Sequence, residues 1–409
     1  MDWPIASFAM LGAALAGQTV FTAVATAAGV FALLFAAAAA FFGRRLLRGL
    51  RRREPATSLP PVTVIKPLKG AAGPLYENLA SFCRQEYPCF QLVFCLQSPD
   101  DPALGVVTRL KREFPGVDME VVVSKNRIGY NPKVNNMANG YAFAKYDLLL
   151  LSDSDVQARP DFLRRMVVPF ANTGTGLVTA FYEATGSHGV WGHMESLSIN
   201  ANFLPQALCA AAFGMRFAMG AAMMVRRAAF EASGGFENLA DHLADDFWLG
   251  ESIREAGWGL ELSDALVETV PDIDNGAEHF KHLARWARTI RICQPYGYAA
   301  SLIQHGFSLL TLKVLLFGAD RRTLALMAAI WAAKAAASLF LDEGLGGRQP
   351  ARALLLLPLA EWFAFAAWFA GYGSSRVLWR GELYEVLSHG RLVPVAAPTA
   401  RPRPVAVEP

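Results

Sequence analysis

The sequence predicts an α/β domain, built on a largely parallel sheet, that is attached to membrane helices. Residues 4–43 contain no charged side chain, and residues 60–290 alternate strand-like runs with amphipathic stretches. Three further apolar segments follow this alternation. The 409-residue chain is 53% hydrophobic, with a mean hydropathy of +0.26, which is too apolar for an ordinary soluble enzyme.

The N-terminal apolar stretch is longer than one membrane crossing needs, because about 20 helical residues span the hydrocarbon core. We expect a spanning helix near residues 22–42, preceded by a second short span or an interfacial helix over residues 4–20. The arginine cluster RRLLRGLRRR, residues 44–53, obeys the positive-inside rule. Residues 1–54 are therefore interpreted as a membrane segment with a basic flank, and the next domain as cytosolic.

Composition limits the partners and the compartment. A net charge of +3 without a visible basic face argues against nucleic acid as a partner. The five cysteines are odd in number and show no metal-ligand spacing, which fits a reduced compartment. The Ala- and Arg-rich composition favours a bacterial source. We therefore expect an integral protein of the bacterial inner membrane whose main domain faces the cytoplasm.

The main domain is predicted from four strand-like runs, which are PVTVIKPLKG, FQLVFCLQ, MEVVVS and YDLLLLSD. Helical patterns such as GVVTRLKREF lie between them, and this order is the βαβ alternation of a doubly wound sheet. The four leucines at 148–151 lack polar alternation, which is typical of an interior parallel strand. We place this cytosolic domain at residues 55–295.

Carboxylates follow the second and fourth of these strands. Asp100 and Asp101 come after the second, and Asp153 and Asp155 come after the fourth. The carboxyl ends of parallel strands share one edge of a sheet, where α/β folds bind ligands. Asp153 and Asp155, two positions apart, can share a Mg²⁺ or Mn²⁺ ion that keeps sites free for phosphate oxygens. Taken alone, such a short pattern is more often a solvated acidic turn.

Two later motifs extend this pattern. HLADDFWLG carries Asp245 and Asp246, and HLARWARTIR carries Arg285 and Trp286. Singly, the first indicates an acidic first turn of a helix, and the second a cationic belt beside a membrane. Together with the earlier aspartates, they indicate a metal site, a general base and a clamp for a diphosphate.

Seven motifs in order, KPLKG, DDPA, YNPKVNN, YDL, DSD, ADDFW and RW, resemble the ceramide glucosyltransferase family, which consists of membrane-anchored inverting enzymes. The resemblance covers residues 60–290 closely. It implies a GT-A (Rossmann-like) glycosyltransferase domain flanked by transmembrane helices, a UDP-sugar donor and a membrane lipid acceptor. Bacterial hopanoid glycosyltransferases share every one of these motifs, so ceramide and hopanoid acceptors both stay open.

The resemblance also implies residue roles. It assigns the nucleotide contact to Asp101, the metal to Asp153 with Asp155, and the catalytic base to Asp246. Arg285 and Trp286 match the family's last signature and are expected in catalysis, whereas a histidine stands where that signature has Gln or Arg. Substrate-binding roles are expected for Asp101, Lys133, Asn135, Asn136, Asp245, His282 and Lys66. Among these, Lys133 would offset diphosphate charge.

Two features have a local structural interpretation as well. Asn131 is expected to cap a helix that has Pro132 in its first position. The glycine of AMGAAMMVRR is expected to let a substrate approach closely.

The C-terminal apolar segments predict transmembrane or interfacial helices over residues 296–375 and a tail over residues 376–409. Polar residues in the first segment place it at the interface or beside a polar cavity. These residues are Gln304, His305 and Lys313. Lys334 and Glu361, in the later segments, are expected to pair or to reach the membrane interface.

Two other functions are weighed against this one. A processive polysaccharide synthase needs an intact QxxRW motif, and His282 counts against it. A catalytically silent scaffold or a lipid transporter has no physical need for clustered carboxylates, whose repulsion a cation must relieve. The sequence leaves open the sugar, the lipid, the number of crossings and the oligomeric state.

Overall fold

The computed structural model describes residues 3–395 apart from 57, 72, 187, 347–349, 380–381 and 388–389, and it divides into two compact units. We call the first the membrane unit, made of Met1–Arg45, Gly189–Ala212 and Ile273–Gly373. The second is the sheet unit, made of Leu46–His188, Phe213–Asp272 and Ser374–Pro409. The segments 189–212 and 273–295, which the sequence analysis places in the domain 55–295, belong to the membrane unit.

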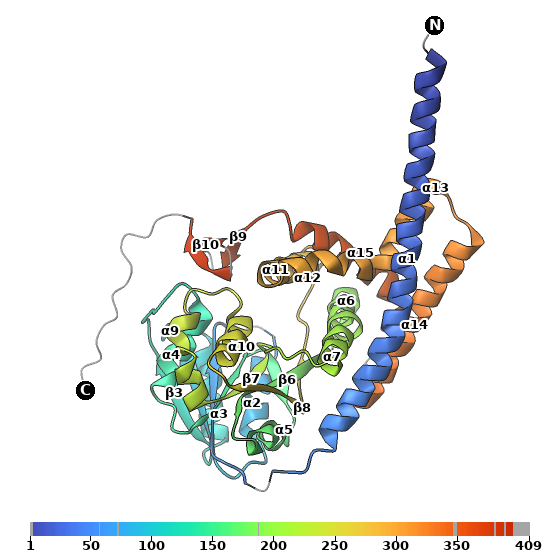
Figure 1. Cartoon of the computed structure of the whole chain (residues 1–409). Coiled ribbons are helices and arrows are strands. Elements are labelled where there is room, and N and C mark those ends of the chain that lie inside the picture. Colours follow the sequence, from blue (N-terminus) through green and yellow to red (C-terminus); the bar gives the residue numbers. More distant parts are fainter. Residues whose placement is uncertain are drawn as a thin grey trace. The chain divides into compact units, whose positions relative to one another are not determined.

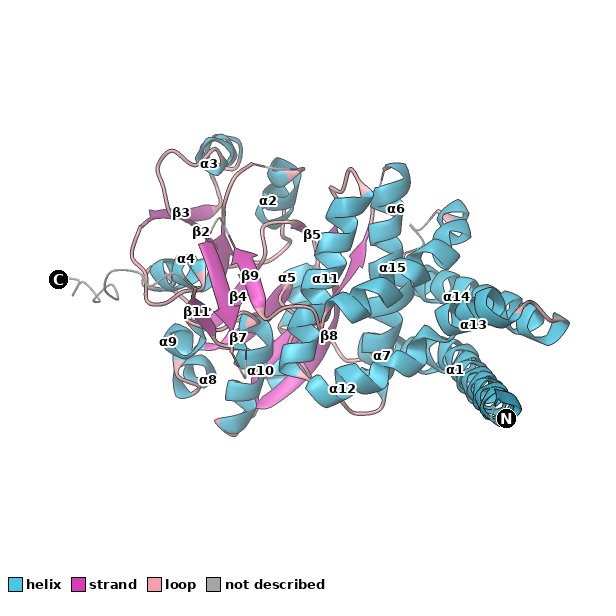
Figure 2. Cartoon of the chain, turned by 90° about the horizontal axis from the view of Figure 1, so that it is seen from above, coloured by secondary structure: helices cyan, strands magenta, loops and turns pink. Residues whose placement is uncertain are grey.

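The sheet unit is built on an eight-stranded sheet with the order β3-β2-β1-β4-β7-β6-β8-β5. Its strands are drawn in magenta in Figure 2. Neighbours β1, β2, β3 and β4 are parallel, as are β6 and β8, whereas β7 and β5 run antiparallel to their neighbours. The strands are β1 (Val62–Pro67), β2 (Phe90–Leu96), β3 (Asp118–Val123), β4 (Leu148–Ser152), β5 (Val156–Ala158), β6 (Thr175–Ala184), β7 (Ala222–Arg226) and β8 (Gly259–Thr269).

Helices cover both faces of this sheet. They are α2 (Leu75–Cys83), α3 (Ala103–Glu113), α4 (Pro132–Tyr141), α5 (Phe162–Met166), η1 (Val168–Ala171), α8 (Arg227–Ala232), α9 (Gly235–Leu239) and α10 (Asp245–Glu255). Leu148 and Leu150 of β4 pack into one core cluster with α2, α3 and α5. Leu149 and Leu151 pack into a second cluster with α4, α8, α9 and α10. Both faces of β4 are buried, which explains why its sequence does not alternate.

A second, three-stranded sheet belongs to the same unit. Its strands are β9 (Arg376–Trp379), β10 (Glu382–Val386) and β11 (Leu392–Pro394). The main-chain N–H of Leu392 donates to the carbonyl of Asp241, and Tyr384 lies 6.1 Å from Tyr130 between ring centroids. This small sheet therefore packs on the loop before α10.

The membrane unit is helical. It contains the first 43 residues of α1 (Trp3–Arg51), then α6 (Gly189–Leu197), η2 (Ser198–Phe203), α7 (Leu204–Ala212), α11 (Gly276–Cys293), α12 (Pro295–Ala300), η3 (Ser301–His305), α13 (Gly306–Phe317), α14 (Arg321–Leu345), η4 (Ala351–Leu356) and α15 (Leu357–Ala370). Among the described residues, four stretches are long and apolar enough to cross a membrane, and the first of them continues into the sheet unit: Ala16–Arg51, Pro295–Phe317, Arg321–Leu345 and Ala351–Ala370. Residues 3–51 form one continuous helix rather than two segments (Figure 1).

Close contacts join the long helices. In α1, the added methyl group of an alanine at position 29 would lie 2.6 Å from Leu310 of α13, and Gly306 lies against the main chain of Ala28. Small residues therefore let α1 and α13 approach each other, as in other membrane helix pairs.

The predicted local elements are confirmed. All four predicted strands form, and GVVTRLKREF lies within and just after α3. Asn131 caps α4, accepting hydrogen bonds from the N–H groups of Lys133 and Val134, with Pro132 in the first turn.

We predict that Gly140→Ala lowers the stability of the sheet unit by about 1–3 kcal/mol, because overpacking of a core typically costs this much. The new Cβ atom would lie 2.2 Å from the sulfur of Cys95 and 3.2 Å from Val93. Gly105→Ala, in helix α3 with nothing within 4 Å, is the matched control and should not destabilise the protein. Thermal unfolding of both variants checks this; equal melting temperatures would contradict the packing.

Candidate functional site

A buried lysine is hydrogen-bonded to the turn after β4. Lys66, at the end of β1, is 0% exposed, and its ammonium group donates to the Ser152 hydroxyl at 2.9 Å and to the Asp153 carbonyl at 2.7 Å. It also lies 3.4 Å from the ring centroid of Phe82. Burial lowers the pKa of Lys66 to about 7, against the opposing effect of Asp153 and Asp155. These two hydrogen bonds from Lys66 hold the turn in place. The expected contact of Lys66 with the substrate stays a prediction.

Lys133, in the first turn of α4, joins two acidic segments. Its ammonium group lies 2.8 Å from a carboxylate oxygen of Asp153 and 3.2 Å from one of Asp245. Burial alone favours the neutral amine, but the charges of Asp153 and Asp245 outweigh it and raise the pKa of Lys133. The lysine therefore stays cationic and holds the β4 turn beside the start of α10.

The acidic groups around Lys133 repel each other. Burial, and then the charges of Asp246 and Asp153, raise the pKa of Asp245 to about 6, although Lys133 opposes this. Asp155 reaches solvent, yet the surrounding protein removes enough water from its carboxylate to raise its pKa, and the charge of Asp153 adds to the effect. A cation at this edge of the sheet would relieve that repulsion.

Asp246 is held by main-chain groups. One of its carboxylate oxygens accepts a hydrogen bond from the N–H of Gly220 at 2.9 Å, and the other accepts from its neighbour Phe247 at 2.8 Å. The adjacent carbonyl of Ala221 accepts from the N–H of Asp153 at 3.1 Å. The short segment before β7 therefore links the aspartate expected to act as base to the aspartate expected to bind metal.

The glycine of AMGAAMMVRR thus has an identified neighbour. A Cβ atom at position 220 would lie 3.0 Å from the Asp246 carboxylate. The group that approaches this glycine in the structure is Asp246. The sequence analysis missed this role of Gly220, because nothing in the local pattern points to residue 246.

The remaining predicted residues of the sheet unit border the same edge. Asp101 accepts from the N–H groups of Gly70 and Ala103, each at 2.9 Å, and so ties the loop after β1 to the loop after β2. Asn135 bonds the main chain of Ile128 and Gly129 and shapes the loop before α4. Asn136 donates to the carbonyl of Leu68, and its own side-chain oxygen is buried without a partner among the described residues.

Two carboxylates are available for a metal ion at this edge. In the part of the chain that the structure describes, no group of three or more His, Cys, Asp or Glu side chains forms a complete metal site. Asp153 and Asp155 are both accessible, with 34% of the Asp153 side chain exposed. Mg²⁺ commonly binds one or two carboxylates and completes its shell with water and phosphate oxygens, so this donor set fits such an ion.

Three predicted residues lie on α11 in the membrane unit. His282 and Trp286 are one turn apart, with ring centroids 4.5 Å apart, and Arg285 beside them is exposed. The sequence analysis missed the partner of the histidine, which is Glu195 on α6. The Nδ1 atom of His282 lies 2.6 Å from this carboxylate, and that of His279 lies 2.8 Å from it.

Glu195 is the carboxylate that both histidines contact. It is 2% exposed, and burial alone would raise its pKa. The hydrogen bonds and charges of the two imidazoles outweigh burial and lower the pKa of Glu195 to about 2. The carboxylate therefore stays ionised and fixes the orientation of His282.

The chain is similar to known ceramide glucosyltransferases. Ceramide glucosyltransferase 1 of Caenorhabditis elegans is 30% identical over 241 residues, which are 58% of this chain and 51% of the relative. Ceramide glucosyltransferase of Candida albicans is 38% identical over 120 residues, 26% of this chain and 22% of the relative. The chain thus spans about half the length of the C. elegans relative that it matches.

A solved structure shows the same fold. Mannosyltransferase PcManGT from Pyrobaculum calidifontis, in complex with GDP-Man and Mn²⁺, has a TM-score of 0.51 at 21% identity, covering 87% of this chain and 97% of that one. The prediction of a GT-A glycosyltransferase domain with flanking apolar helices is confirmed. Residues 19–392 match the model of the family described as "Glycosyl transferase family 21". The chain belongs to this family, which confirms the resemblance to ceramide glucosyltransferases.

Proposed function

We propose that the protein transfers a hexose from a UDP-sugar to a hydroxyl group of a membrane lipid, with inversion, as in a ceramide glucosyltransferase. One observation carries the proposal: Lys133 joins Asp153, after β4, to Asp245, beside Asp246. This brings the expected metal ligand and the expected base to one edge of the sheet. The apolar helices and the ceramide glucosyltransferase relatives support a lipid acceptor.

In this proposal, Asp246 acts as general base. Its carboxylate takes the proton of the acceptor hydroxyl while the hydroxyl oxygen bonds to the anomeric carbon from the face opposite the diphosphate. The bond between the anomeric carbon and the phosphate oxygen breaks, and its electron pair leaves with UDP. The N–H of Gly220 keeps the carboxylate oriented during this step.

Asp153 and Asp155 would hold Mg²⁺ or Mn²⁺ together with the diphosphate of the donor. Such an ion neutralises the negative charge that gathers on a departing phosphate. Lys133 contributes a fixed positive charge beside the same aspartate. Asp101, Asn135 and Asn136 shape the adjoining loops, and Arg285, Trp286 and His282 are proposed to contact the substrates.

The proposed setting is the bacterial inner membrane, with the sheet unit facing the cytoplasm. The arginines at the end of α1 support this orientation. The activity and the acceptor are tested together by incubating the purified protein with several UDP-sugars and with ceramide, diacylglycerol and hopanoid acceptors. Product masses identify the sugar and the lipid, and no glycosylated product in any combination would overturn the proposal.

Asp246→Asn should lower turnover by at least about 10²-fold, because an amide cannot accept the hydroxyl proton, and should retain donor binding. The amide oxygen can still accept the hydrogen bond from Gly220, and only the bond from the N–H of Phe247 is lost. Turnover measurements and calorimetric titration with UDP-sugar and Mn²⁺ check this.

Asp153→Asn should weaken donor and metal binding together, since the variant loses one of two anionic ligands. The same titration with and without Mn²⁺ separates the two roles. A catalytically silent scaffold gives no metal-dependent heat with the unmodified protein. An equal loss of donor affinity in Asp153→Asn and Asp246→Asn would contradict the assigned roles.

Gly220→Ala should lower kcat about tenfold and leave donor affinity unchanged, because its Cβ atom would displace the Asp246 carboxylate by a few tenths of an ångström. Gly116→Ala, which meets nothing within 4 Å, is the control. If Gly220→Ala lowers donor affinity instead of kcat, Gly220 does not position the base.

A further inference from the structure

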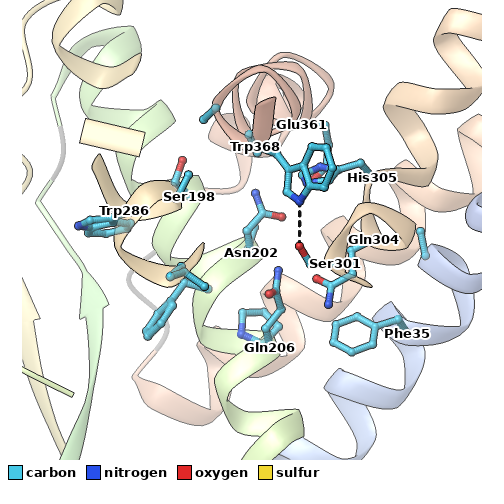
Figure 3. A pocket seen from close by; sticks show the side chains of 18 of the residues that line it. Phe35, Ser198, Asn202, Gln206, Trp286, Ser301, Gln304, His305, Glu361 and Trp368 are labelled. Carbon is cyan, nitrogen blue, oxygen red and sulfur yellow. Dashed lines mark hydrogen bonds between the residues drawn. The ribbon is translucent and has the colours of Figure 1, made fainter. Parts of the chain in front are cut away.

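A cavity lies entirely within the membrane unit. Its volume is about 380 Å³, and its walls come from α1, η2, α7, α11, α12, η3, α14 and α15. Apolar side chains such as Phe35 and Trp286 line much of it, and polar side chains such as Asn202 and Gln304 lie between them (Figure 3). The walls include parts of all four stretches that are apolar enough to cross a membrane.

A buried ion pair, Lys334 with Glu361, lies in the polar part of the cavity wall. The ammonium of Lys334 on α14 lies 2.5 Å from the carboxylate of Glu361 on α15, and Glu361 is 4% exposed. The expected pairing of these residues is confirmed. Charges in apolar membrane segments are costly to bury and commonly mark a functional site. Because the two charges cancel, this zone attracts neither anions nor cations by net charge.

Asn202 connects this pair to the open space. Its side-chain oxygen accepts a hydrogen bond from Lys334 at 3.4 Å. Its side-chain nitrogen is buried and has no hydrogen-bond partner among the described residues. The amide points into the cavity in Figure 3. A buried amide donor without a partner destabilises the protein, and a carbonyl oxygen of a ligand would remove this cost.

The backbone that carries Asn202 is unusual. Ser198–Phe203 form a π-helix between α6 and α7, and Ser198, Asn202 and Phe203 all line the cavity. Such segments amount to well under 1% of residues, and they occur frequently at functional sites. This observation is independent of the charges, and it points to the same wall of the cavity.

We propose that this cavity holds the uncharged polar neck of the lipid acceptor, the part between its hydroxyl headgroup and its hydrocarbon chains, with the side-chain nitrogen of Asn202 donating to a carbonyl oxygen of that neck. This inference rests on the proposed lipid glycosyltransferase function and names the lipid class. About 380 Å³ is near the lower limit of ligand sites, so it accommodates the neck and the first methylene groups rather than a whole two-chain lipid.

The chemistry selects among lipids. An amide- or ester-linked lipid satisfies Asn202, whereas an ether-linked lipid or a bare hydrocarbon ring system leaves this donor unpaired. The neutral Lys334–Glu361 pair offers no countercharge to a phosphate, so an anionic lipid is disfavoured by its own desolvation.

Direct binding of lipid tests the proposal without any dependence on sugar transfer. The full chain in neutral detergent, without sugar nucleotide, is titrated with a short-chain N-acyl sphingoid base and with an alkyl ether analogue lacking the carbonyl. The wild-type protein should bind the carbonyl lipid about three- to tenfold more tightly. Asn202→Leu should bind both lipids equally. If the variant discriminates as well as the wild-type protein does, the proposal is overturned.

The role of the Lys334–Glu361 ion pair is tested by replacing Lys334, with replacement of a second lysine, Lys313, as the control. Lys334→Met should weaken binding of the carbonyl lipid. Lys313→Met, which removes a lysine that also lies in an apolar helix and pairs with Asp320, should leave binding unchanged because Lys313 does not line the cavity. Equal effects of the two variants would overturn the assignment of Lys334 to the site.

A variant with an unpaired positive charge in the cavity should gain affinity for an anionic lipid. Glu361→Gln leaves Lys334 without its counter-ion and should increase the affinity for a short-chain phosphatidic acid relative to the neutral lipid. If the ratio of the affinities for phosphatidic acid and the neutral lipid does not change, the proposed neutral character of the site is wrong. Because Asp246→Asn is expected to lose most of its transfer activity, normal lipid binding by that variant keeps failure of this inference distinct from failure of the proposed function.

Discussion

The gathering of acidic side chains around two lysines is the interaction on which the sheet unit depends. Asp153 and Asp245 share Lys133, and Lys66 supports the Asp153 turn from inside the core. Two like charges 4 Å apart repel by about 4 kcal/mol at an effective dielectric constant of 20, which is comparable with the lower range of a domain's stability. The lysines offset this repulsion in the protein alone, and the donor's metal ion is proposed to offset the rest.

The strand order explains why this gathering occurs where it does. The chain builds β1, β2 and β3 outward in one direction and then returns to place β4 on the other side of β1. Such a reversal separates the loops that follow two parallel neighbours, and α/β folds bind ligands in the resulting crevice. Here β1 delivers Lys66 and β4 delivers Asp153 to that place. The antiparallel strand β7 then brings Gly220 and Ala221, which join Asp153 to Asp246.

The membrane unit handles charge differently. Its Lys334–Glu361 pair and its Glu195–His279 pair are each formed between different helices, so that these buried groups have opposite or hydrogen-bonding partners. These pairs fix the rotation of α11, α14 and α15 more specifically than apolar packing alone does. The proposed acceptor cavity lies where one such pair meets the π-helical segment Ser198–Phe203.

The sequence by itself determined the four parallel strands, the cap at Asn131, the apolar helices and the family, whereas the roles of the site residues stay predictions. Burial periodicity and caps depend on residues only a few positions apart, so they are visible in the chain. Only the tertiary structure decided that Lys66 bonds the turn at Asp153, 87 residues later, and that Gly220 orients Asp246, 26 residues later. The continuous helix α1, the Glu195 partner of His282 and the polar cavity were likewise decided by packing. Strand order and helix contacts bring such groups together. Because these residues are far apart in the chain, no local sequence pattern indicates that they are neighbours.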